Sequence, residues 1–129
     1  MNLLIDTHAL IWFITDNERL PLKTKQIIEN KENYCYVSIA TYWELGIKNS
    51  IGRLDLYSNL ETIFQIIEET GFETLPITTN QILKNANLEF HHQDPFDRII
   101  IAQSLTEKMT IITKDSQFAN YNVPIIWNN

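Results

Sequence analysis

The chain has 129 residues, a length that suits one domain and allows folding to bury a proper hydrophobic core. Hydrophobic residues make up 44% and charged residues 20%, a globular composition that excludes a largely disordered chain. With 10 basic and 16 acidic residues, the net charge of −6 argues against non-specific duplex binding, which depends on neutralising many phosphates. A nucleic-acid enzyme remains open, because carboxylates that hold metal ions count as negative in the same tally.

Cysteine usage and the amino-terminal segment indicate the compartment. Cys35 is the single cysteine, so neither an internal disulfide nor a cysteine-based zinc site is expected. The apolar start of the chain lacks a basic leading segment and is interrupted by Asp6 and His8, so it does not resemble a signal peptide. No stretch approaches the roughly 20 apolar residues that span a bilayer. We therefore expect a cytoplasmic protein.

Alternating strands and helices are predicted along the chain. The predicted strands are Asn2–Asp6, a β-rich run from Tyr34 to Val37, Phe72–Ile77, Met109–Thr113 and Val123–Trp127. The predicted helices are Leu20–Asn30, Ser38–Ser50, Asn59–Thr70, Thr79–Asn87 and Pro95–Lys108. Ser38 is a plausible N-cap, and Gly71 a plausible stop for the preceding helix. Thr7 either caps a further helix after the first strand or orients Asp6.

The strands are short and mostly apolar on both faces, which is typical of a parallel sheet covered by helices on both sides. The expected fold is therefore a three-layer α/β/α sandwich with a central parallel sheet of about five strands. We find no repeat, no low-complexity tract and no internal boundary. A single domain over residues 1–129 is expected.

Four acidic residues are predicted to converge at one end of this sheet. Asp6 ends the segment LLID and Asp115 directly follows TIITK, so both lie at the carboxyl ends of predicted strands. Glu44 and Asp97 fall in the early turns of helices that start at the same edge. Clustered carboxylates raise one another's pKa values or bind cations, and oxygen-only sites suit Mg²⁺ or Mn²⁺. Metal-dependent phosphodiester hydrolysis is the reaction class that fits best.

Four segments also resemble, in order, the successive motifs of the PIN-domain nucleases. They are LLIDTHALIWF, SIATYWELGIK with GRL shortly after, HHQDPFDRIIIAQ and ITKDSQF. The similarity runs from Asn2 to about Trp127, and the closest resemblance is to the VapC-type toxins of bacterial toxin–antitoxin pairs. Four motifs in order, with DPFDR-x-x-I-A-Q intact, make a specific match.

This resemblance implies a PIN-like fold and a Mg²⁺- or Mn²⁺-dependent endoribonuclease that a partner antitoxin silences. Carried over by motif, Asp6, Glu44 and Asp97 would form the acidic core that holds metal. Asp115 would be a fourth acid with a more variable share in coordination. An RNA substrate and a homodimer are further properties that the family implies.

Each acid also has a simpler structural explanation, and Asp6 would then only end a strand and make a turn. Glu44 and Lys48 are spaced for an i, i+4 helix pair. Asp94 before Pro95 suits an N-cap, and we assign it that role. Asp97 would only complement the helix dipole, and Asp115 would only cap a short helical turn.

Basic and histidine residues are further candidates for the site. Candidates for contact with a substrate phosphate are Lys48, Arg53, Arg98 and Lys114. Arg98 alternatively pairs with Asp94 in a structural role. His8 is expected to be structural or to face the substrate. His91 and His92 are adjacent and lack further cysteine or histidine partners at zinc-site spacing, so zinc is not expected.

Three other functions compete with this interpretation. A receiver-like signalling domain needs an Asp after a central strand, but there is none between Asp16 and Asp55, and Asp55 lies in a predicted loop. A phosphatase of the haloacid dehalogenase type needs a D-x-D pair after the first strand, where this chain has His8. A catalytically weak PIN-fold protein that binds RNA or a partner is the remaining alternative.

Overall fold

The computed structural model describes residues 1–54 and 58–128 of the chain. Asp55, in a loop according to the sequence, lies outside the described residues. Among the helices that are described, none has both the length and the hydrophobicity needed to cross a bilayer.

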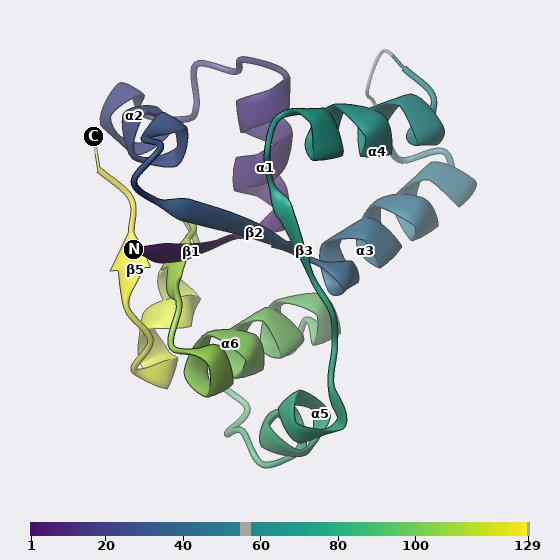
Figure 1. The fold of residues 1–129 in the computed structure, drawn as a ribbon. Coiled ribbons are helices and arrows are strands. Elements are labelled where there is room, and N and C mark those ends of the chain that lie inside the picture. Colours follow the sequence, from purple (N-terminus) through teal and green to yellow (C-terminus); the bar gives the residue numbers. More distant parts are fainter. Residues whose placement is uncertain (55–57, 129) are drawn as a thin grey trace.

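Five parallel strands form one sheet in the described part of the chain (Figure 1). They are β1 Asn2–Ile5, β2 Tyr34–Ser38, β3 Glu73–Leu75, β4 Thr110–Ile112 and β5 Ile125–Ile126. The spatial order is β3-β2-β1-β4-β5, and every pairing is parallel. β1 is therefore central, and the chain changes direction across the sheet between β1 and β4. The predicted parallel sheet is confirmed.

Helices cover both faces of this sheet (Figure 1). They are α1 Thr7–Ile14, α2 Leu22–Glu29, α3 Ile39–Ser50, α4 Leu60–Glu69, α5 Thr79–Ala86, α6 Pro95–Glu107 and a 3₁₀-helix over Ser116–Tyr121. Helices α1, α2, α3 and α4 share one core with Leu3 and Ile5, while α6 and the 3₁₀-helix share another with Leu4 and Ile111. Successive side chains of a strand point to opposite faces, so β1 is buried on both. The three-layer α/β/α sandwich is confirmed.

Helix ends follow the predicted signals in most places. The Ser38 hydroxyl accepts a hydrogen bond from the amide of Ala40 at 3.0 Å and caps α3. Gly71 follows α4 with φ of 101°, a left-handed conformation that favours glycine. The prediction that Thr7 caps a helix is wrong, since Asp6 caps α1 and accepts from the amide of Ala9 at 2.8 Å.

The edge strands are shorter than predicted. β3 covers three residues of the predicted 72–77, and β5 covers two of the predicted 123–127. Pro76 directly follows β3 and Pro124 directly precedes β5. Proline has no amide hydrogen for a sheet ladder, so it limits strand pairing.

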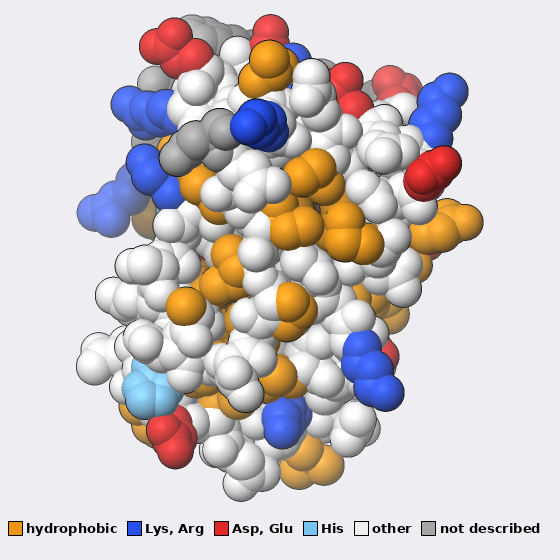
Figure 2. Space-filling model, turned by 90° about the vertical axis from the view of Figure 1, so that its left-hand side faces the viewer, with side chains coloured by type: hydrophobic (Ala, Val, Ile, Leu, Met, Phe, Trp, Pro, Cys, Tyr) orange, Lys and Arg blue, Asp and Glu red, His pale blue; other side chains and the backbone are white. Residues whose placement is uncertain are grey.

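Figure 2 shows the side of the molecule on which α2, β5 and both termini lie in Figure 1. Hydrophobic side chains are visible there in a broken band, with charged groups mainly toward its margins. A cavity of about 560 Å³ lies at the amino-terminal ends of β2 and β3, with Phe13, Tyr34 and Phe72 in its lining. The four acids singled out from the sequence lie at the other end of the strands.

Candidate metal centre

The four acidic side chains come together at the carboxyl-terminal edge of the sheet. Asp6 directly follows β1, and Asp115 is the third residue after β4. Glu44 lies in the second turn of α3, and Asp97 lies in the first turn of α6. The strand order reverses between β1 and β4, and ligands of parallel sheets bind beyond the strand ends at such a reversal. Parallel strands and the helices that follow them therefore bring acids from four distant positions to one place.

Asp6 is held from two sides and is only 5% exposed. One carboxylate oxygen caps α1, and the other accepts a hydrogen bond from the Thr113 hydroxyl at 2.5 Å. Burial raises the pKa of Asp6, while the bonds from Thr113 and Ala9 oppose the shift. Repulsion from Asp115 adds to the rise in this pKa, which indicates that the two acids lie within reach of each other.

Glu44 combines the predicted helix pair with a buried position. Its Oε2 lies 3.1 Å from Nζ of Lys48, and its Oε1 accepts a hydrogen bond from the Thr7 hydroxyl at 2.6 Å. The residue is 8% exposed, so this is not a solvated surface pair. Thr7 therefore orients Glu44, and the alternative expectation that it orients Asp6 is not met.

The start of α6 gives Asp94 and Asp97 different roles. Oδ1 of Asp94 accepts from the amides of Phe96 and Asp97 at 2.9 and 3.0 Å, as expected for the N-cap. The pKa of Asp97 is raised to about 7, first by burial and then by repulsion from Asp94, Asp6 and Glu44, while His92 opposes the shift. Besides burial, three neighbouring acids thus raise the pKa of Asp97.

Asp115 both caps a helix and joins the cluster. Its Oδ1 accepts from the amide of Gln117 at 2.9 Å, the N-cap bond that the sequence allowed. Its Oδ2 lies 2.9 Å from Nε2 of His92, and its own amide donates to the Thr113 hydroxyl at 3.0 Å. Thr113 therefore links Asp115 to Asp6.

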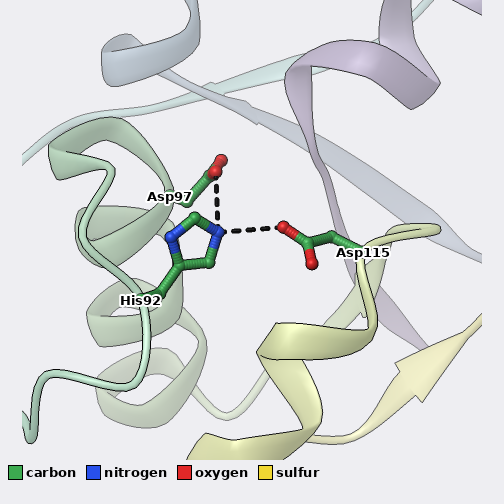
Figure 3. Close-up of side chains that lie close together, drawn as sticks. All are labelled: His92, Asp97 and Asp115. Carbon is green, nitrogen blue, oxygen red and sulfur yellow. Dashed lines mark hydrogen bonds and ion pairs between the residues drawn. The ribbon is translucent and has the colours of Figure 1, made fainter.

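His92 is the main site residue that the sequence did not reveal. Its Nε2 lies between Asp97 and Asp115, 3.1 Å from Oδ2 of the former and 2.9 Å from Oδ2 of the latter (Figure 3). The side chain is 11% exposed. His91 instead lies 2.8 Å from Glu89. A histidine two residues before a capping Asp was the signal, but only the fold shows which of the two adjacent rings faces the acids.

Arg98 is used to hold the chain that carries His92. The buried guanidinium donates to the carbonyl oxygens of Asn85, Leu88, Glu89 and His92 at 2.9–3.2 Å, and to the Tyr121 hydroxyl at 3.3 Å. It also lies 4.1 Å from the Phe90 ring centroid. The structural role is therefore the one observed, with partners other than the expected Asp94, and we do not carry Arg98 forward as a phosphate contact.

The other basic candidates lie at the surface. Lys48 is the partner of Glu44, Arg53 is exposed in the turn after α3, and Lys114 precedes Asp115. Nζ of Lys114 lies 5.9 Å from the ring centroid of Trp12. A polar hollow of about 380 Å³ also adjoins the cluster, lined by His91, His92, Gln93, Asp94 and Gln117.

Comparison with models of protein families shows to which family the chain belongs. A family model described as the PIN domain matches residues 3–124. The chain belongs to the PIN domain family. No curated protein matches it significantly.

Solved structures share this PIN fold over nearly the whole chain. VapBC2 from Rickettsia felis, solved with a DNA fragment from its promoter, has a TM-score of 0.75 at 14% identity and covers 99% of this chain and 100% of that one. VapBC-1 from nontypeable Haemophilus influenzae has a TM-score of 0.71 at 17% identity, with coverage of 98% and 97%. FitAcB from Neisseria gonorrhoeae has a TM-score of 0.68 at 19% identity and covers 96% of each chain. Likeness at such identities establishes the fold.

The donor set of this PIN domain fits a hard divalent cation. The four carboxylates would offer oxygen ligands, which Mg²⁺ and similar ions prefer. The raised pKa of Asp97 reflects burial and crowding of negative charge, and a bound cation removes part of that penalty. The residues that would hold the ion are Asp6, Glu44, Asp97 and Asp115.

The Asp97→Asn variant should reveal this penalty in metal-free protein. Because the pKa of Asp97 is higher in the folded than in the unfolded chain, its contribution to stability is present below about pH 4 and is lost as the pH rises through about 7. The amide of the variant stays neutral, so the stability of the variant relative to wild type should rise between pH 4 and pH 8 by on the order of 2 kcal/mol. Urea unfolding in EDTA at both pH values measures this.

A matched control is Asp16→Asn, since Asp16 is exposed and its pKa is lowered by a hydrogen bond from Lys25. The free energy of unfolding of Asp16→Asn, relative to that of wild type, should not increase as the pH rises. Adding millimolar Mg²⁺ at pH 8 should stabilise the wild type more than Asp97→Asn. A pH-independent difference for Asp97→Asn would contradict the electrostatic account.

Proposed function

We propose that this PIN domain is a cytoplasmic, Mg²⁺- or Mn²⁺-dependent endoribonuclease of the VapC type, the toxin of a toxin–antitoxin pair. The observation that carries the proposal is the meeting of Asp6, Glu44 and Asp97 beside Asp115 at the sheet edge, with the pKa of Asp97 raised to about 7. VapBC structures share the fold, and VapBC-5 from Mycobacterium tuberculosis is described as a member of the VapBC family of toxin–antitoxin systems, which supports the toxin–antitoxin assignment.

This proposal assigns separate roles to the residues that would hold the cation and to those that orient them. Asp6, Glu44 and Asp97 hold the cation, and Asp115 assists. When bound, the cation supplies charge that stabilises a phosphoryl transition state and acidifies a water molecule for attack on the RNA phosphodiester. The hydroxyls of Thr113 and Thr7 hold one oxygen of Asp6 and one of Glu44, which orients the remaining lone pairs.

In this proposal, basic residues around the acidic cluster contact the phosphates of the RNA. Lys48 places a positive charge directly beside Glu44, 3.1 Å from its Oε2. Arg53 and Lys114 are exposed, so a guanidinium fork and a flexible ammonium group are both available to RNA phosphates. The polar hollow lined by Gln93 and Gln117 gives RNA a place next to the acids.

RNA cleavage by purified protein tests the enzymatic part. We expect discrete fragments from total RNA with Mn²⁺ or Mg²⁺ and none with EDTA. Asp6→Asn should lower the rate by about 100-fold or more, because several kcal/mol of transition-state stabilisation depend on the held cation. Denaturing gel electrophoresis measures the rate.

The matched control is Asp16→Asn, the same chemical change at an exposed residue that pairs with Lys25. Purified in parallel, it should cleave like wild type, which shows that an Asp→Asn change as such does not abolish cleavage. The loss of cleavage in Asp6→Asn purified in the same way excludes a contaminating nuclease. Cleavage that persists in Asp6→Asn would refute the metal assignment. No cleavage by folded, partner-free wild type with metal would favour the binding-only alternative.

The antitoxin is proposed to block this acidic pocket with a basic side chain. Opposite charges favour such a contact. Because salt screens this attraction, the affinity of the complex should fall as the ionic strength rises. A small protein encoded beside this chain should suppress RNA cleavage when the two are purified together. Replacing Lys and Arg in its terminal segment with Ala should restore cleavage in the same gel assay. Suppression that survives this replacement would show that another contact is responsible.

A homodimer is proposed to form over α3 and α5. Ile39, Trp43 and Ile47 make a stripe of exposed apolar residues along α3, with exposed fractions of 42%, 63% and 38%. Beside it, Ile82 of α5 and Phe96 line an apolar cavity of about 260 Å³. Exposed apolar surface of this kind is typical of a subunit interface.

Trp43→Glu should therefore convert a dimer to a monomer, because it would bury a charge in an apolar interface. Light scattering coupled to size-exclusion chromatography measures the mass. Leu22→Glu is the control, since Leu22 is 68% exposed on α2, outside this surface. A wild-type monomer, or equal loss of dimer in both variants, would contradict the proposed interface.

A further inference from the structure

We propose that His92 is a positioning residue whose Nε2–H bridges Asp97 and Asp115 and sets the distance between them, and that it does not itself bind the cation. The inference rests on the proposed function only in that both carboxylates belong to the proposed metal centre. It starts from the position of Nε2, which lies 2.9 Å from Oδ2 of Asp115 and 3.1 Å from Oδ2 of Asp97 (Figure 3).

The other ring nitrogen determines which tautomer is present. Nδ1 of His92 accepts a hydrogen bond from the amide of Asp94 at 3.2 Å. A neutral imidazole carries one hydrogen, so an accepting Nδ1 leaves that hydrogen on Nε2. Nε2 is therefore a donor placed between two acceptors, and one N–H is shared by two carboxylates.

The same tautomer argues against His92 as a metal ligand. Coordination through Nε2 would require the ring hydrogen to move to Nδ1, where it would meet the amide hydrogen of Asp94. Two donors would then face each other. His92, Asp97 and Asp115 offer ligand atoms within 4.8 Å of one another, but only the two carboxylates are free of this conflict.

The ring is held firmly enough to act as a bridge. It is packed edge-on against Phe118, with ring centroids 5.6 Å apart and planes at 82°. Its backbone amide donates to the Tyr121 hydroxyl at 2.7 Å, and its carbonyl oxygen accepts from Arg98 at 3.1 Å. Tyr121 and Arg98 thus hold the segment from which the imidazole projects.

The bridge decides which oxygens remain for a cation. Oδ2 of Asp97 and Oδ2 of Asp115 are turned toward His92, and Oδ1 of Asp115 caps the 3₁₀-helix. Among residues 1–54 and 58–128, Oδ1 of Asp97 receives no hydrogen bond, so this atom is left to face the cation with Asp6 and Glu44. Without the N–H, the two carboxylates would repel each other and separate.

Nitrogen NMR of protein labelled with ¹⁵N-histidine tests the hydrogen position directly. At pH 8, the spectra should show hydrogen on Nε2 of His92, both before and after addition of Mg²⁺. His92→Gln identifies the resonance by its loss. An Nε2 without hydrogen in either state would overturn the proposal, and this readout is independent of nuclease activity.

Two substitutions separate the functions of the two ring nitrogens. Gln places an amide N–H near the position of Nε2, whereas Asn places its oxygen near Nδ1 and cannot reach the carboxylates. We expect His92→Asn to weaken Mn²⁺ binding about 10-fold or more, and His92→Gln to stay within about threefold of wild type, as for partners that orient metal ligands. Titration calorimetry measures the affinity, and circular dichroism confirms that both variants fold.

His91→Gln is the control, since His91 is a partner of Glu89 outside the bridge. It should bind Mn²⁺ like wild type. Equal affinity in wild type and His92→Asn would overturn the bridge and leave the proposed function intact. Failure of wild type itself to bind Mn²⁺ would refute the metal centre of the proposed function, while the NMR result would still decide the tautomer.

Discussion

Crowding of negative charge at one buried edge of the sheet is the constraint on which this structure depends. A carboxylate removed from water is costly unless hydrogen bonds or opposite charge compensate it. Asp6 receives bonds from Thr113 and Ala9, Glu44 from Thr7 and Lys48. The compensation is incomplete, since the pKa of Asp97 remains raised to about 7. This edge of the sheet therefore holds the acids in place while part of their negative charge stays uncompensated, and a bound cation would compensate it.

Helix capping provides much of that compensation. Asp6 and Asp115 each use one oxygen to cap the helix that follows, and Asp94 caps α6. A helix N-terminus presents unpaired N–H groups, so it tolerates a carboxylate where other backbone would not. Each cap fixes one oxygen and leaves the other for the site: Oδ2 of Asp6 for Thr113, and Oδ2 of Asp115 for His92. The strand–helix junctions of the fold therefore determine the directions of the acidic side chains.

Local signals allowed much of the fold and the acids to be predicted from the sequence, and tertiary contacts explain the rest. The Ser38 and Asp94 caps and the end of α4 shortly before Gly71 depend on neighbouring residues alone. Helix α1 was harder, because its residues continue the apolar run of β1 and its cap is Asp6 itself. The role of His92 depends on Asp115, which is 23 residues away. Arg98 was a candidate for a phosphate contact or for a pair with Asp94, but it donates to four carbonyl oxygens in the fold.

The DPFDR segment shows why fold and site cannot be separated in this chain. Asp94 caps α6 through its side chain and selects the tautomer of His92 through its amide. Asp97 faces the other acids, and Arg98, the next residue, holds the carbonyl oxygens of the segment that ends at His92. A change at Arg98 would therefore reach Asp97 and Asp115 through His92 without touching either carboxylate. The bridge makes the acidic edge one connected unit, running from Asp6 through Thr113 and Asp115 to His92 and Asp97.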